Sequence, residues 1–143
     1  MHRLLILAGL LLALLSPVAA ARGQDQPGLA AAAQRARGAW FGHDAAGLVA
    51  DSPRLLVQLP GTDPSVALGP EQAAALLADF LATAQEVETT VRAAREVEPG
   101  RGYVELQRRY RIAGTQEVRT QSLLLGYRLA RTGWSLVELR VVG

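Results

Sequence analysis

The chain offers few side chains whose types and spacing could do chemistry. His43 and Asp44 form the only histidine–acid pair after residue 20, and such a pair is a common basis for general acid–base catalysis. Asp44 also stands directly before Ala-Ala-Gly-Leu-Val, where an aspartate accepts a hydrogen bond from the first turn of a helix. Because capping is the simpler role, we predict no catalytic residue here. With no cysteine and a single histidine after residue 20, neither a metal site nor a cofactor is expected.

A second set of candidates depends on strand alternation. Residues 87–142 predict four amphipathic antiparallel strands joined by tight turns, and the loop lengths set the register of each hairpin. The turns lie at residues 99–102, 114–117 and 131–133. Since side chains alternate with a period of two, this register gathers one apolar face. That face comprises Val87, Val91, Ala93, Val97, Val104, Leu106, Tyr110, Ile112, Leu123, Leu125, Tyr127, Leu129, Val137, Leu139 and Val141.

Polar side chains on this inner face are the candidate ligand-binding residues. They are Arg95, Arg108, Tyr110, Gln121 and Tyr127, joined by Trp40, His43 and Asp44 from the helices. An unpaired guanidinium on an apolar face is costly, so Arg108 indicates a pocket for an anionic small molecule. Alternatively, Arg95 and Arg108 lie near the strand ends, with their charged heads in solvent and their stems over apolar surface. No aspartate or glutamate falls on the predicted inner face, which makes an enzyme the less favoured interpretation.

The opposite face of the sheet carries its own feature. Alternation turns Arg109 and Arg111 outward, towards Glu88, Glu96 and Glu105. It also gathers an apolar patch there, made of Leu124, Trp134, Leu136 and Val142. Such a patch suggests a partner surface, and we expect a homodimer formed through this face.

The segments before the sheet predict the helices that must cover its apolar face. A first helix is expected over residues 29–39, a short second one after Asp44, and a third from Pro70. The buried stripe of the third helix is expected to contain Leu76, Leu77, Phe80, Leu81 and Ala84. A short strand at residues 54–59, followed by a brief one near 66–68, lies between the second and third helices. The order of elements indicates an α+β domain.

The composition and the first twenty residues indicate where in the cell the protein is expected. The chain has 143 residues, 50% of them hydrophobic, a net charge of +2 and no cysteine. Residues 1–20 have the basic start, short apolar run and small residues of a secretory signal, with cleavage after Ala20 or Ala21. We expect a flexible lead-in at 21–28 and a single domain at 29–143, exported to the periplasm or outside the cell and soluble after cleavage. Without a basic block or an aromatic platform, neither nucleic-acid binding nor membrane association of the cleaved product is expected.

The chain resembles a known superfamily in three respects. These are the order of its elements, the Gly-His-Asp-Ala-Ala-Gly-Leu step at 42–48, and the closing Gly-Trp-Ser-Leu-Val-Glu-Leu-Arg-Val strand at 133–141. They are similar to the nuclear transport factor 2-like superfamily, which has the cone-shaped cystatin-like fold. The nearest likeness is to secreted bacterial proteins of the family called domain of unknown function 4783. The resemblance implies a curved antiparallel sheet wrapped round a long helix, with a conical pocket that serves enzymes, binders and dimerisation modules alike.

The leading functional hypothesis is an exported, non-catalytic domain that binds a small ligand in the cone pocket, or a protein partner. One alternative is an enzyme similar to the ketosteroid isomerase-like or SnoaL-like members, which use a pocket carboxylate, often with a tyrosine or histidine. Another is a structural or dimerisation module with a filled cone. A cavity of about 300 Å³ or more, with Arg108 and a tyrosine at its base, would favour binding.

Overall fold

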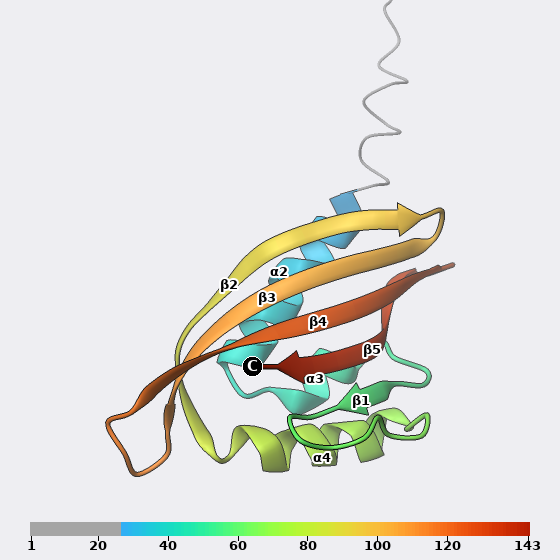
Figure 1. Cartoon of the computed structure of the whole chain (residues 1–143). Helices are drawn as coiled ribbons and strands as arrows, with labels where there is room; N and C mark the ends of the chain where they lie inside the picture. Colours follow the sequence, from blue (N-terminus) through green and yellow to red (C-terminus); the bar gives the residue numbers. More distant parts are fainter. Residues whose placement is uncertain (1–26) are drawn as a thin grey trace, which may run out of the picture.

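A computed structural model describes residues 27–143 of the chain (Figure 1). The predicted signal sequence at 1–20 and most of the predicted lead-in lie outside the described residues. The first described helix begins at Pro27, ahead of the expected start at residue 29. In the part of the chain from 27 onward, no helix is both long and apolar enough to cross a membrane.

The fold is α+β, as predicted, with a helical layer followed by a long-stranded curved sheet. The elements are α2 (Pro27–Phe41), α3 (Ala45–Val49), β1 (Leu56–Gln58), α4 (Pro70–Leu81), β2 (Ala84–Glu98), β3 (Arg101–Ile112), β4 (Val118–Ala130) and β5 (Gly133–Val142). The sheet order is β1-β5-β4-β3-β2, with β1 parallel to β5 and the other pairs antiparallel. The brief strand expected near 66–68 is a single bridge between Leu55 and Leu68.

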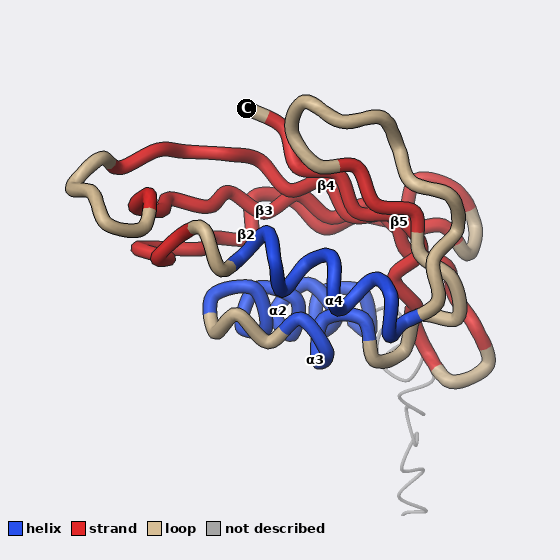
Figure 2. The backbone as a smooth tube through the Cα atoms, turned by 90° about the horizontal axis from the view of Figure 1, so that it is seen from below, coloured by secondary structure: helices blue, strands red, loops and turns tan. Residues whose placement is uncertain are grey.

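The helices lie on one side of the sheet and form the core against it (Figure 2). The inward stripe of α2 consists of small residues around two large ones, so the long helix can approach the strands closely. These buried residues are Leu29, Ala32, Ala33, Ala36 and Trp40. In α4 the buried stripe is Ala73, Leu77 and Leu81, whereas Leu76 is 36% exposed and Phe80 is only partly buried. The predicted stripe of α4 was therefore correct at Leu77 and Leu81 and wrong at Leu76.

Register shifts interrupt the simple alternation of β2. The shifts fall between Glu86 and Glu88, between Val91 and Ala93, and between Glu96 and Glu98. Each extra residue turns the side chains that follow it to the other face of the sheet. Val87 and Val97, which were expected on the inner face, are therefore 36% and 49% exposed.

A fourth shift, between β4 and β5, corrects the predicted outer patch. It pairs Tyr127 with Leu136 where unbroken alternation placed Val137. As a result Trp134 and Leu136 turn inward, are 6% and 3% exposed, and belong to the core. The prediction that these two residues lie on the outer face was wrong. Leu124 and Val142, the other members of that patch, are half-buried.

Leu129, near the end of β4, was also misplaced by the uninterrupted pattern. It was expected on the inner face and is 50% exposed, one residue before the strand ends at Ala130. The centre of the inner face is as predicted. Its fully buried residues are Val104, Leu106, Leu123, Leu125, Leu139 and Val141.

Candidate functional site

The first register shift in β2 places a carboxylate on the inner face. Glu86 pairs with Tyr110 and Glu88 with Arg109, so the intervening residue bulges out and both Glu86 and Thr89 point inward. The Glu86 side chain is 2% exposed. The prediction that no acid lies on this face was therefore wrong. The strand starts at Ala84, ahead of the expected residue 87, so Glu86 was not counted among the strand residues at all.

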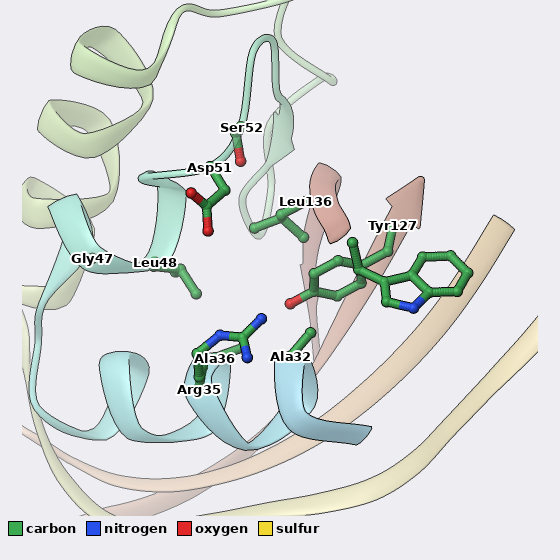
Figure 3. Close-up of a pocket in the computed structure, with 10 residues that line it drawn as sticks. Ala32, Arg35, Ala36, Gly47, Leu48, Asp51, Ser52, Tyr127 and Leu136 are labelled. Carbon is green, nitrogen blue, oxygen red and sulfur yellow. The ribbon is translucent and has the colours of Figure 1, made fainter. Parts of the chain in front are cut away.

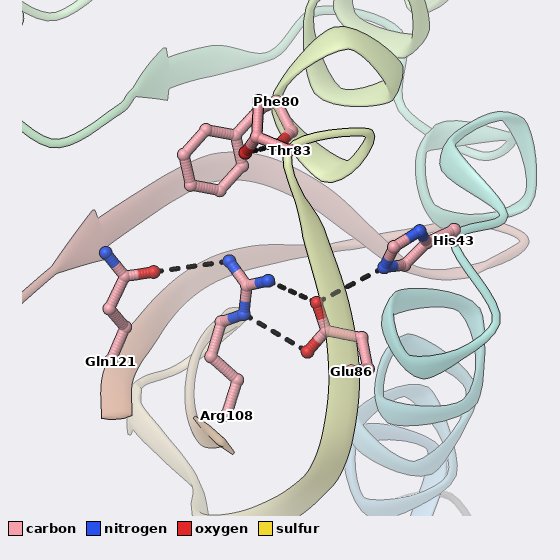
Figure 4. Close-up of polar contacts among 6 residues, drawn as sticks. All are labelled: His43, Phe80, Thr83, Glu86, Arg108 and Gln121. Carbon is pink, nitrogen blue, oxygen red and sulfur yellow. Dashed lines mark hydrogen bonds and ion pairs between the residues drawn. The ribbon is translucent and has the colours of Figure 1, made fainter. Parts of the chain in front are cut away.

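Glu86 neutralises the buried guanidinium of Arg108 (Figure 4). Arg108 Nε donates to Glu86 Oε2 at 3.1 Å, and Arg108 Nη2 donates to Glu86 Oε1. The third nitrogen, Nη1, donates to Gln121 Oε1 at 3.2 Å. With an exposure of 1%, Arg108 neither reaches solvent nor awaits an anion from outside. Two alternatives were predicted for Arg108: that it binds an anionic ligand, or that its charged head lies in solvent. The internal ion pair with Glu86 corrects both.

Aromatic rings complete the surroundings of Arg108. Its guanidinium carbon lies 4.0 Å from the ring centroid of Tyr110, 5.1 Å from that of Trp40 and 5.5 Å from that of Phe80. Electron-rich ring faces stabilise a desolvated cation, so these contacts reinforce the ion pair with Glu86. This end of the cone is filled by side chains, and Arg108 lines neither the small cavity nor the outer groove described below.

His43 and Asp44 do not act as a pair. His43 Nε2 lies 3.2 Å from Glu86 Oε1, and its backbone adopts the left-handed conformation with φ of 55°. Asp44 instead accepts a hydrogen bond of 2.9 Å from the backbone N–H of Gly47 and caps α3, which confirms the predicted structural role. The acid partner of the histidine is therefore Glu86, contributed by a strand that is remote in sequence.

A small cavity lies at the other end of the cone, between α2, α3 and the strands β4 and β5 (Figure 3). Its volume is about 110 Å³. Its lining is mixed, with apolar walls and a few polar groups. The lining residues are Ala32, Arg35, Ala36, Gly47, Leu48, Asp51, Ser52, Tyr127, Trp134 and Leu136.

The polar groups of this cavity come from three segments that are distant in sequence. Figure 3 shows the guanidinium of Arg35 and the hydroxyl of Tyr127 approaching one another, with Asp51 and Ser52 on the far wall. The Ser52 hydroxyl is buried and has no hydrogen-bond partner within residues 27–143. Burial raises the pKa of Tyr127 to about 12, and the positive charge of Arg35 offsets only part of this increase. The phenol therefore stays protonated near neutral pH and can donate a hydrogen bond.

The five predicted ligand-binding residues thus lie in three different places. Tyr127 lines the small cavity. Arg108 bonds to Gln121 and packs on Tyr110, so these three residues form one buried network. Arg95, which was expected on the inner face, lies on the outer one with its guanidinium 5.4 Å from the ring of Tyr103, because the shifts in β2 reverse its direction.

Three lining residues of the cavity were missed from the sequence. They are Arg35 and Asp51, which are exposed, and Ser52, which is buried. The only available signal was the polar Asp-Ser step before Pro53, which reads equally well as a plain helix terminus. As for metals, residues 27–143 contain no group of three or more His, Cys, Asp or Glu side chains that could hold an ion.

The fold was compared with known proteins, by sequence and by structure. No family model matches the sequence, and no curated protein matches it. A Bacteroides ovatus protein of the domain of unknown function 4783 family has a TM-score of 0.61 and 9% identity, over 75% of this chain and 90% of that one. A ketosteroid isomerase-like protein from Erwinia carotovora atroseptica has a TM-score of 0.65 and 17% identity, over 79% and 91%.

A third similar structure contains a ligand. It is a protein with a ketosteroid isomerase-like fold from Catenulispora acidiphila, in complex with trimethylamine. Its TM-score is 0.62 and its identity 14%, over 78% of this chain and 84% of that one. At these identities the likeness concerns the fold alone. The chain has the nuclear transport factor 2-like, cystatin-like fold, and its structural neighbours include proteins of the domain of unknown function 4783 family.

Proposed function

We propose that this chain is an exported, non-catalytic binding domain whose ligand is a small organic acid held in the cavity between α2, α3 and β4. The observation that carries the proposal is the buried Ser52 hydroxyl, which faces this cavity without a hydrogen-bond partner among the described residues. A buried polar group without a partner costs free energy. A bound polar molecule would remove that cost.

The size of the cavity restricts the ligand. At about 110 Å³ it is smaller than an apolar cavity of about 150 Å³ that accepts benzene, and far below the usual range for drug-sized ligands. Only a molecule of a few non-hydrogen atoms fits. The Catenulispora acidiphila protein, in complex with trimethylamine, is a case of this fold with a ligand of that size.

The charges around the cavity restrict the chemistry. Arg35, Ser52 and the protonated hydroxyl of Tyr127 are three donors, and three convergent donors favour a carboxylate. Asp51 is an acceptor on the same wall, so the ligand should carry a donor next to its carboxylate. A small hydroxy acid or amino acid satisfies both conditions, and glycolate and glycine are the simplest representatives.

An enzyme is less well supported than a binder. His43 and Glu86 form a histidine–carboxylate pair, with side-chain exposures of 31% and 2%, but neither residue lines the small cavity. Glu86 is already engaged by Arg108, so it could accept a proton only at the expense of that ion pair. Export rests on the signal-like composition of residues 1–20. The predicted homodimer stays a prediction, now carried by Leu124 and Val142.

The test is a titration of the protein with glycolate, glycine and acetate, followed by amide chemical shifts. Glycolate or glycine should perturb the amides around Ser52 and Tyr127, and acetate should bind more weakly because it cannot donate to Asp51. Arg35→Gln and Ser52→Ala should each weaken binding by about tenfold. Arg37→Gln is the matched control, since it makes the same charge change on the same helix away from the cavity. Equal affinities for Arg35→Gln and Arg37→Gln would overturn the proposal.

A further inference from the structure

We propose a second binding site on the outer face of the sheet, a groove that takes an apolar carboxylate. The site is separate from the small cavity proposed above and shares only Tyr127 with its lining. It is built on one row of the sheet to which each of the five strands contributes one residue. In register order across the sheet the row runs Arg95, Tyr103, Gly126, Glu138 and Leu56.

A glycine in the middle of this row creates the hollow. Gly126 has no side chain, so the outer face is open between Tyr103 and Glu138. The groove above it has a volume of about 450 Å³, within the usual range of about 300–1,000 Å³ for small-molecule sites. A ligand here can be much larger than one that fits the inner cavity.

Two arginines face each other beside the hollow. Arg101 and Arg128 are direct cross-strand partners, and like charges in that position destabilise a sheet. Arg101 has one ion pair, of 3.3 Å with the exposed Glu98, and within residues 27–143 Arg128 has none. An anion placed between the two guanidinium groups would relieve the repulsion and could accept bidentate hydrogen bonds.

The rest of the groove is suited to an apolar body. Val97 and Leu56 are 49% and 42% exposed at its margins, which is high for large aliphatic side chains. The ring of Tyr103 gives a flat wall, and the guanidinium of Arg95 lies 5.4 Å from its centroid. Glu138, the one acid of the lining, lies on the β5 side and disfavours a second anionic group there. The combination fits a monoanion with its carboxylate at Arg101 and Arg128 and a planar apolar body against Tyr103.

A fluorescent probe, 2-naphthoate, has this chemistry. Titration of the protein should give saturable binding that weakens as salt is raised, because Arg101 and Arg128 are exposed. Arg101→Gln and Arg128→Gln should each raise the dissociation constant by about tenfold. Arg119→Gln, on the same strand as Arg128 but at its far end, makes the same charge change and should have no effect. The neutral 2-naphthylmethanol should bind about tenfold more weakly than 2-naphthoate.

A second variant tests the shape of the groove without changing its charge. A methyl group at Gly126 would lie 3.3 Å from Glu138 Cβ and fill the floor, so Gly126→Ala should abolish naphthoate binding. Ser52→Ala, in the inner cavity, should leave it unchanged, which separates this site from the proposed function. The proposal is overturned if wild type does not bind naphthoate, for instance because a second copy of the chain covers the groove. It is also overturned if the arginine variants bind as tightly as Arg119→Gln.

Discussion

The carboxylate of Glu86 and the guanidinium of Arg108 meet inside the cone through two of the nitrogens of the arginine, with exposures of 2% and 1%. A register shift at the start of β2 makes this contact by turning Glu86 inward. Burying both charges is costly, and their attraction repays that cost only while the two partners remain together. The pair therefore ties the first residues of β2 to the centre of β3.

Removal of one partner should destabilise the protein severely. Glu86→Gln leaves the guanidinium of Arg108 buried without a counter-ion, so we expect the free energy of unfolding to fall by about 3–5 kcal/mol. Urea denaturation checks this value. Glu88→Gln is the matched control, because Glu88 pairs with Arg109 at 3.3 Å on the exposed face, with side-chain exposures of 57% and 49%. The control should lose about 1 kcal/mol or less, and similar losses for both variants would contradict the assigned role.

Removal of both partners together should cost less than removal of one. In Glu86→Leu/Arg108→Met, apolar side chains of similar length fill the same space and no buried charge remains. We expect the double variant to be more stable than Glu86→Gln by about 2 kcal/mol or more. The same denaturation series measures the difference. A double variant no more stable than Glu86→Gln would mean that Arg108 is held chiefly by its aromatic neighbours and Gln121.

The buried phenol of Tyr127 predicts a loss of stability at high pH. Burial raises the pKa of this phenol from its ordinary value of 10.0 to about 12, so between these values the unfolded chain loses the proton and the folded chain keeps it. The unfolded state then binds fewer protons, and stability falls as pH rises through that interval, by about 2–3 kcal/mol in total. Below pH 10 the contribution of this group is fully present.

Tyr127→Phe isolates the effect. Without the phenol, the free energy of unfolding should decline less between pH 10 and 12, and the difference from wild type should approach the value given above. Denaturation at several pH values, with phenolate absorbance to follow ionisation directly, provides the measurement. Identical declines in wild type and variant would show that the hydroxyl is solvated in the folded protein.

The sequence was sufficient for the class of fold and insufficient for the candidate site, for one physical reason. Helix caps are local, so Asp44 and Pro70 could be placed from neighbouring residues alone. The hairpin loops were located but predicted too long: residues 99–102 and 131–133 were expected, whereas Glu98 pairs with Arg101 and Ala130 with Gly133, so these loops are residues 99–100 and 131–132. Burial in the middle of the sheet followed from strict alternation, which holds for β3 and for most of β4. A bulge depends on how strands pair in three dimensions, and nothing in the sequence marks it.

The bulges moved several residues from one face of the sheet to the other. The shift after Glu86 supplied the missing acid, those further along β2 moved Arg95 outward, and the one after Gly126 moved Trp134 and Leu136 into the core. The inner cavity could not be predicted from the sequence either, because Arg35, Asp51 and Tyr127 come together only when α2, α3 and β4 pack.

Two glycines with contrasting surroundings test the packing of α2 against the sheet. A Cβ at Gly102 would lie 2.8 Å from Leu29 Cδ1 and 3.3 Å from Trp134 Cζ3, so Gly102→Ala should push the start of α2 away from β3. We expect the free energy of unfolding to fall by about 1–3 kcal/mol.

A Cβ at Gly38 would meet nothing within 4 Å, and the residue lies within the helix. Gly38→Ala should therefore raise the free energy of unfolding by about 0.5–1 kcal/mol, since alanine favours the helix. Thermal unfolding of both variants gives the two signs, and a stabilised Gly102→Ala would mean that α2 does not pack closely on β3 at Leu29.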